Sequence, residues 1–182
     1  FDRIAQLKQE RAAARLFAEI TSPETAEIAD ARVRGFLIRL GHLNNDILAP
    51  YLLQVFAKAR DGELSTDDLV AVLKVLLAYL ARRLFIGIPT TGLNQLFAAL
   101  NRQVEHMMAK SQIGYVDALK VMLTQGVKDN KRFPTDQALR EALAEKDYYH
   151  MSSASLWFIL DELNNADGEK QHLFEAAADG QY

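Results

Sequence analysis

Two adjacent arginines, Arg82 and Arg83, are the strongest candidates for chemistry in this sequence. They end a long apolar segment, and the turn Gly-Ile-Pro-Thr-Thr-Gly follows them directly. Neighbouring residues on a helix point about 100° apart, so the two side chains cannot face one ligand from the same stripe. Cations near a helix C-terminus are also stabilised by the helix dipole. We therefore expect one arginine to pair with a carboxylate and the other to bind carbonyls at the helix end, while a ligand or nucleic-acid contact stays open as the alternative.

A modest basic surplus follows between residues 102 and 132. It includes Lys128, Lys131 and Arg132. Such a face could contact a phosphate backbone, although a merely solvated face is the favoured interpretation. Together with Arg82 and Arg83, these three residues are the candidate contacts to nucleic acid or to a neighbouring domain.

Motifs for catalysis are missing from the sequence. The four histidines are each more than 20 residues from the next, and no Gly-x-Ser-x-Gly motif is present. The Gly-Ile-Pro-Thr-Thr-Gly turn lacks the lysine of a phosphate-binding loop, and Asp-Gly-Glu-Leu-Ser-Thr-Asp-Asp lacks the ligand spacing of a calcium loop. We expect no catalytic residue, cofactor site or metal site in this chain.

Length and composition favour an ordinary globular protein. The chain has 182 residues, no cysteine, 25% charged residues and a formal net charge of −3. This charge argues against an autonomous nucleic-acid-binding protein, which usually carries a basic surplus. The lack of cysteine favours a cytoplasmic location. Lys74, Arg82 and Arg83 interrupt the most apolar stretch before it reaches the roughly 20 apolar residues of a membrane span, so we expect no membrane insertion.

The hydrophobic pattern is helical throughout, and it predicts an all-α fold. We expect an irregular bundle of about eight or nine helices around a central apolar helix at 66–86. Ser65 is the expected N-cap of that helix, with Asp68 three residues later. A second helix is expected to begin at Ser22 and Pro23. Further helices are predicted at about 2–20, 46–60, 93–110, 115–125 and 134–145, with a last one that begins at Ser152 or Ser153.

The domain boundaries predicted from these elements are 1–165 for the bundle and 166–182 for an acidic helix or frayed tail. The helical pattern already runs at the first residues, which start with Phe-Asp-Arg rather than Met. We therefore expect the chain to be a piece of a longer protein.

Three segments in order carry a family resemblance: LARRLFIGIPTTGLNQLFAAL, KRFPTDQALREAL and YYHMSSASLWFILDELNN. In this order they resemble the helical middle region of a bacterial domain-of-unknown-function family, typified by the GmrSD-type, modification-dependent (type IV) restriction endonucleases. The resemblance covers roughly residues 65–165. The matching residues are Arg82, Arg83, Leu93, Asn94, Phe97, Phe133, Pro134, Asp136, Leu139, Leu143 and Leu160.

This resemblance implies a context in DNA-targeting defence. Family members carry a nucleotide-hydrolysing N-terminal domain with an Asp-Gly-Gln-Gln-Arg signature, and an HNH-type nuclease domain that cleaves DNA with a metal ion. Neither signature occurs in this sequence, so no catalytic residue can be transferred. The implied role is a non-catalytic connector between flanking domains, with DNA as a partner of the parent protein. The alternative is a helical protein-interaction or scaffold module with no nucleic-acid role.

Overall fold

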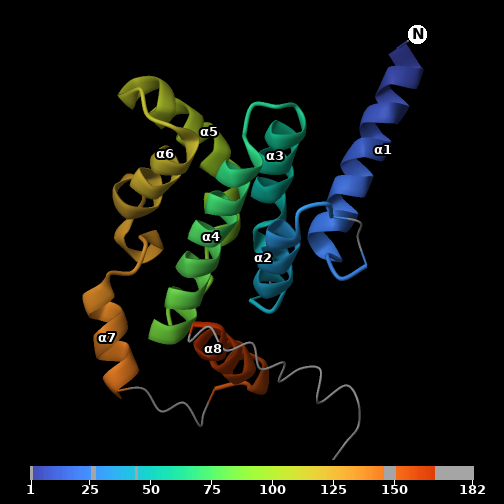
Figure 1. The fold of residues 1–182 in the computed structure, drawn as a ribbon. Coiled ribbons are helices and arrows are strands. Elements are labelled where there is room, and N and C mark those ends of the chain that lie inside the picture. Colours follow the sequence, from blue (N-terminus) through green and yellow to red (C-terminus); the bar gives the residue numbers. More distant parts are fainter. Residues whose placement is uncertain (1, 26–27, 44, 146–150, 167–182) are drawn as a thin grey trace, which may run out of the picture. The chain divides into compact units, whose positions relative to one another are not determined.

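The chain is all-helical, as the sequence predicts. A computed structural model describes residues 2–25, 28–43, 45–145 and 151–166 (Figure 1). These residues form eight α-helices and no strand, in agreement with the expected eight or nine helices. The helices are α1 (Asp2–Thr21), α2 (Ala31–Gly41), α3 (Ala49–Arg60), α4 (Thr66–Ile86), α5 (Leu93–Ser111), α6 (Tyr115–Val121), α7 (Asp136–Glu145) and α8 (Ser153–Ala166).

The chain divides into two compact units, residues 1–145 and 146–182. The first holds α1 to α7, and the second holds α8. The expected boundary at residue 165 stays a prediction. The acidic segment at 167–182 lies outside the described residues.

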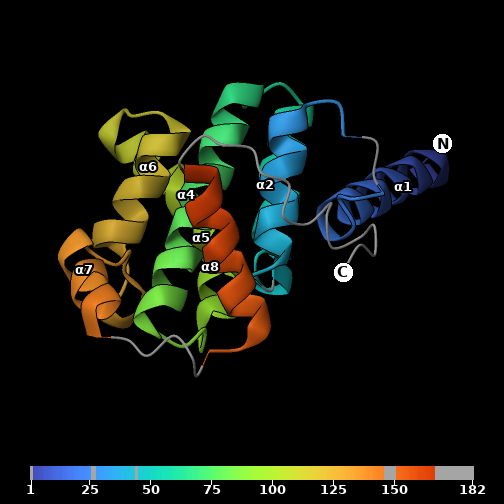
Figure 2. The same cartoon turned by 60° about the horizontal axis from the view of Figure 1, so that its bottom comes forward.

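Helix α4 is the central element of the first unit. It contacts α2, α3, α6 and α7, and α2 and α6 lie on opposite sides of it in both ribbon views (Figures 1 and 2). Its buried residues are Leu69, Val72, Leu73, Leu76, Leu77, Tyr79, Leu80 and Arg83. Each leucine buried in this way contributes roughly 1.5–3 kcal/mol. The predicted central apolar helix is confirmed.

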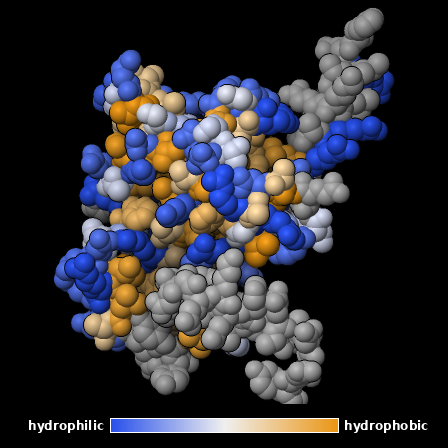
Figure 3. Space-filling model, in the orientation of Figure 1, coloured by the Kyte–Doolittle hydropathy of each residue, from blue (hydrophilic) through white to orange (hydrophobic). Residues whose placement is uncertain are grey.

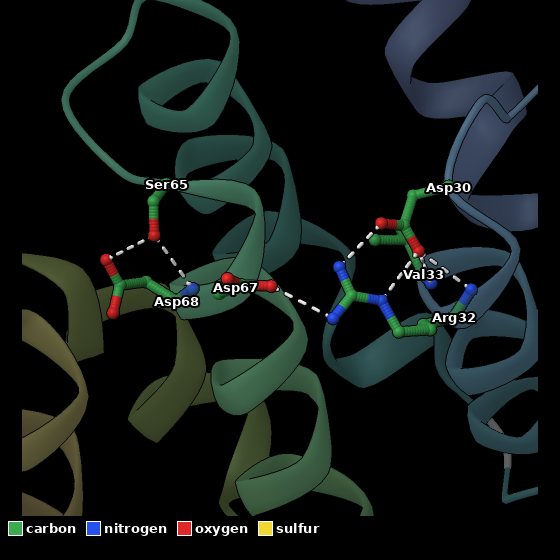
Figure 4. Close-up of polar contacts among 6 residues, drawn as sticks. All are labelled: Asp30, Arg32, Val33, Ser65, Asp67 and Asp68. Atoms are coloured by element: carbon green, nitrogen blue, oxygen red, sulfur yellow. Dashed lines mark hydrogen bonds and ion pairs between the residues drawn. The ribbon is translucent and has the colours of Figure 1, made fainter.

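Local signals fix both ends of α4. Ser65 Oγ accepts a hydrogen bond from the Asp68 backbone N–H (3.1 Å) and donates one to Asp68 Oδ2 (2.7 Å), as Figure 4 shows. This is the N-cap that the sequence predicts. At the other end Gly87 has φ +82°, and the Gly87 and Ile88 amides both bond to the Arg83 carbonyl. Glycine suits this left-handed position because it has no Cβ.

The predicted start of the second helix is wrong. Ser22 to Thr25 form a turn, and α2 begins only at Ala31 with Asp30 as its N-cap. Arg34 donates to the carbonyls of Pro23 (3.1 Å) and Glu24 (2.7 Å), so a tertiary contact uses carbonyls that a helix would need for itself. Propensity at Ser-Pro-Glu is a weak preference, and this contact overrides it.

Asp30 and Arg32 connect the starts of α2 and α4. Arg32 donates to Asp30 (Nη2 to Oδ2, 2.8 Å) and to Asp67 of α4 (Nη1 to Oδ1, 2.9 Å), as drawn in Figure 4. The hydrogen bond from Arg32 lowers the pKa of Asp30 from 3.8 to about 2. The contribution of Asp30 to stability is therefore present above its ordinary pKa and absent below its folded pKa.

The segment after α5 begins as the α-helix α6 and continues as a π-helical turn. Residues Met122–Gly126 form one π-turn, which completes the helix expected to reach Gln125. Helix α7 begins beside Thr135, whose Oγ1 accepts from the Ala138 N–H (3.2 Å). Helix α8 begins after Ser152, whose Oγ accepts from the Ser155 N–H (3.2 Å), one of the two predicted caps.

None of the helices in the described part of the chain combines the length and the apolar character that a membrane span requires.

The face of the molecule in Figure 3 alternates between apolar and hydrophilic patches. Where the structure describes side chains, the large apolar residues that are exposed are Phe17, Leu143, Trp157 and Leu160.

Candidate functional site

The two arginines of the opening motif lie at the C-terminal end of α4 and bind the loop between the π-turn and α7. Arg83 is 2% exposed. Its Nη1 donates to the Asn130 carbonyl (2.9 Å), and its Nη2 donates to the Pro89 carbonyl (2.6 Å). The guanidinium carbon lies 5.4 Å from the centre of the Tyr79 ring. Arg83 thus joins α4, the Gly-Ile-Pro-Thr-Thr-Gly turn and the loop.

Arg82 points to the other end of the same loop. Its Nη1 donates to the Pro134 carbonyl (3.0 Å) and forms an ion pair with Asp136 at the start of α7. Its guanidinium also lies 5.3 Å from the centre of the Phe133 ring. Arg82 therefore pairs with a carboxylate, while Arg83 binds carbonyls of the turn and loop rather than those of α4 itself.

Tyr79 completes this contact from one turn earlier on α4. Its hydroxyl donates to the Lys131 carbonyl (2.8 Å), and its ring lies 5.8 Å from Phe133 and 6.2 Å from Phe97 of α5. Burial raises the pKa of Tyr79, although nearby Arg83 lowers it in part. We call Tyr79, Arg82 and Arg83, with the loop residues 130–136 that they bind, the latch.

The chemistry available in the latch is structural. A guanidinium buried without a carboxylate is costly unless its N–H groups are used. Two of the Arg83 nitrogens bind backbone carbonyls, while its Nε has no hydrogen-bond partner among the described residues. The ring of Tyr79 supplies further attraction through its π face. These donors face the chain itself, so the arrangement holds the loop in place and presents no open anion site.

The three other predicted contact residues lie on the same loop but do not converge. Lys128 is exposed. Lys131 is half-buried. Its side chain packs against Gly92 at the end of the Gly-Ile-Pro-Thr-Thr-Gly turn, where an alanine Cβ would lie 3.2 Å from Lys131 Cε. Arg132 Nε donates to the Val127 carbonyl (3.3 Å). Their role as nucleic-acid or interdomain contacts stays a prediction.

In the described part of the chain, no group of three or more His, Asp or Glu residues is arranged to hold a metal ion. His42 and His106 are exposed, and His150 and His172 lie outside the described residues.

A buried polar chain that the sequence reasoning missed joins α3, α5 and α6. The Tyr115 hydroxyl donates to Asn101 Oδ1 (2.7 Å), and it lies 3.0 Å from the Tyr51 hydroxyl. Since Tyr115 has one proton and an amide oxygen can only accept, Tyr51 is the donor to Tyr115. Asn101 Nδ2 then donates to Glu105 (3.1 Å), and Glu105 pairs with Lys58 (2.7 Å).

Burial governs the ionisation of this chain. It raises the pKa of Tyr115 to about 12 and that of Tyr51 well above its ordinary value. The hydrogen bonds with Glu105 and Glu63 raise the pKa of Lys58. Both tyrosines are therefore neutral at physiological pH, and these hydrogen-bonded side chains form a structural junction between the three helices. No local motif could have indicated it, because the tyrosine contacts that join the three helices connect residues 14 and 64 positions apart.

A groove between α1 and α3 is the second feature that the sequence reasoning missed. Three arginines line it: Arg11, Arg15 and Arg60. The i, i+4 spacing of Arg11 and Arg15 is the signal that indicates a shared face.

No family model, no curated protein and no solved structure matches this chain.

Proposed function

We propose that this chain is a non-catalytic helical connector of a nucleotide-dependent, DNA-targeting defence protein of the restriction type. One observation supports the proposal best. The first two of the three motif segments that carry the family resemblance are separate in the sequence, and Arg82 and Arg83 join these two at one place. The arginine pair binds the turn through Pro89 and the Phe-Pro-Thr-Asp loop through Pro134 and Asp136.

This geometry suits a connector for a mechanical reason. Helix α4 has 21 residues and is therefore about 30 Å long. Its N-terminal end is tied to α2 through Arg32 and Asp67, and its C-terminal end is tied to the loop before α7. A rigid element fixed to different neighbours at its two ends can transmit a displacement between them. In the proposed role, it couples nucleotide hydrolysis in one flanking domain to DNA cleavage in another.

The second candidate is a helical protein-interaction module without a nucleic-acid role. The contacts of Arg82 and Arg83 favour this second candidate, because both side chains donate to backbone carbonyls of this chain. The net charge of −3 is also compatible with it. The two candidates differ in what the parent protein contains and not in the fold of this chain.

The complete reading frame that encodes this chain discriminates between them. The connector proposal expects an Asp-Gly-Gln-Gln-Arg segment upstream, in a protein that hydrolyses nucleotide and cleaves modified DNA. A frame that encodes neither this segment nor any other nucleotide-hydrolysing domain contradicts the connector and favours the interaction module.

A variant of that complete protein tests the coupling itself. Arg83→Met removes the buried donor of the latch, and it should reduce nucleotide-dependent DNA cleavage while nucleotide hydrolysis continues. The matched control is Arg3→Met, at an exposed position on α1 outside the basic surplus at 102–132. If Arg83→Met lowers neither the rate of cleavage nor its dependence on nucleotide, the latch has no role in coupling.

A further inference from the structure

The groove between α1 and α3 combines an apolar floor with arginines along its walls. Helix α1 packs on α3, and Leu16 and Ile20 are buried among its described side chains. Next to this contact lies a groove of about 870 Å³. Its apolar lining residues are Ala14, Leu16, Phe56 and Ala59. The alanines leave the space that larger side chains would fill.

The charges around the groove are mostly positive. Arg11 and Arg15 come from α1 and Arg60 from the last turn of α3, and among the described side chains Glu19 is the carboxylate that lines it. Arg11 and Arg15 form no hydrogen bond or ion pair with the described part of the chain. Arg60 pairs with its exposed neighbour Asp61 (3.2 Å), a type of contact that contributes little.

This arrangement is unfavourable in isolation and favourable with an anionic partner. Like charges at i, i+4 on a helix repel each other and destabilise it. Carboxylates placed between Arg11 and Arg15 would remove this repulsion and form bidentate hydrogen bonds with their planar guanidinium groups. Arginine is also among the residues that contribute most to binding at protein interfaces.

The shape of the groove favours a helix over a DNA duplex. An amphipathic helix places apolar side chains into an apolar groove at positions i, i+3, i+4 and i+7. Proteins instead read duplex DNA with elements that protrude into its grooves. A concave surface with an apolar floor suits the first kind of contact.

We propose that this groove docks an acidic amphipathic helix of a partner protein. The apolar stripe of that helix lies on Leu16 and Phe56, and its Asp or Glu side chains pair with Arg11, Arg15 and Arg60. The inference does not depend on the connector role, since it rests on residues outside the latch.

The test measures binding of designed peptides to the full 182-residue chain by fluorescence anisotropy. The probe is a labelled helix of about 18 residues, with leucines at helical spacing and glutamates on both flanks of the stripe. One control peptide replaces the glutamates with lysines, and another replaces the leucines with serines. We expect the acidic probe to bind in the micromolar range, with weaker binding at about 0.5 M salt, and neither control peptide to bind.

Matched variants locate the binding on the chain. Arg11→Gln with Arg15→Gln should weaken binding of the acidic probe by about tenfold or more. Arg102→Gln with Lys110→Gln changes the net charge equally on exposed residues of α5, and it should leave binding within twofold. Arg11→Glu with Arg15→Glu should reverse the preference, so that the lysine peptide binds. Helix content and the unfolding midpoint of each variant show that it is folded.

Three outcomes would overturn the proposal. The acidic probe does not bind, or it binds equally well to the Arg11→Gln, Arg15→Gln variant. In the third outcome, a DNA duplex competes with the probe and binds more tightly through the same two arginines, which makes the groove a nucleic-acid site.

Discussion

Individual side chains in the latch divide the task of holding one loop. Arg83 supplies one buried donor to the loop and a second to the turn at Pro89. Arg82 supplies a donor and a charge, and Tyr79 supplies a hydroxyl and an aromatic face. A hydrogen bond that involves a charged group contributes about 1.5–3 kcal/mol, and a neutral one contributes about 1 kcal/mol. The two arginines should therefore matter more to the loop than the tyrosine hydroxyl does.

Tyr79→Phe removes the smallest of these contributions. The ring keeps its place beside Arg83, Phe97 and Phe133, but the hydrogen bond to the Lys131 carbonyl is lost. We expect the free energy of unfolding to fall by about 1 kcal/mol in denaturant titration. Tyr79→Leu also loses the aromatic contacts, so its free energy of unfolding should be lower still. Equal stability of the two variants would show that the ring contributes nothing beyond its apolar area.

Asp30 gives a prediction for pH dependence. Its pKa is about 2 in the folded protein and near 3.8 otherwise. Since the folded pKa is depressed, the stabilisation is complete above about pH 4 and is lost as the pH falls towards 2. Asp30→Asn keeps a capping oxygen and removes the charge. The thermal midpoint of the wild type should exceed that of the variant at pH 7, and the difference should shrink between pH 4 and pH 2.

The control for this prediction is Asp46→Asn, at an exposed carboxylate without a described hydrogen bond or ion pair. The difference between Asp46→Asn and the wild type should not change over this range. A difference for Asp30→Asn that stays constant down to pH 2 would mean that Arg32 does not hold the carboxylate in its charged form.

At the scale of elements, local signals predicted α4 well and α2 poorly. Ser65 and Gly87 bracket an apolar pattern, and each satisfies backbone groups at its own end of α4. Ser22 and Pro23 form an equally good local start signal, but Arg34 binds the carbonyls that follow. Start signals decide a helix boundary only where no distant side chain competes for the same carbonyls.

Asn101 tests the junction between α3, α5 and α6. It is 7% exposed, and it accepts from Tyr115 and donates to Glu105. Asn101→Ala leaves the Tyr115 hydroxyl without its acceptor in a buried place, so we expect a loss of about 2–3 kcal/mol. Thermal or denaturant unfolding measures it.

Asn94→Ala is the matched control, because Asn94 is exposed on the same helix. It should change stability by less than about 0.5 kcal/mol. A double-mutant cycle with Tyr115→Phe should show a coupling energy between Asn101 and Tyr115. If Asn101→Ala is as stable as Asn94→Ala, the polar chain does not hold the three helices together.

At the scale of the whole molecule, the latch joins residues that are far apart in the sequence. Arg83 and Asn130 are 47 positions apart, and Arg82 and Pro134 are 52 apart. Periodicity and capping act over a few residues, so they predict the helices but not which loop meets which helix end. The sequence therefore supported a structural role for the arginines without locating their partners. For the same reason, the sequence predicted neither the polar side chains that join α3, α5 and α6 nor the groove between α1 and α3.

Amide hydrogen exchange in the loop tests the latch most directly. The Phe133 N–H bonds to the Leu123 carbonyl, and the Lys131 N–H bonds to the Lys128 carbonyl, both at 2.8 Å. If Arg83 holds this loop, Arg83→Met should speed exchange at both amides by about tenfold or more, equivalent to 1.4 kcal/mol of local stability. Arg102→Met should leave both unchanged. Unchanged protection of Phe133 in Arg83→Met would contradict the conclusion that the arginine pair serves as a structural latch.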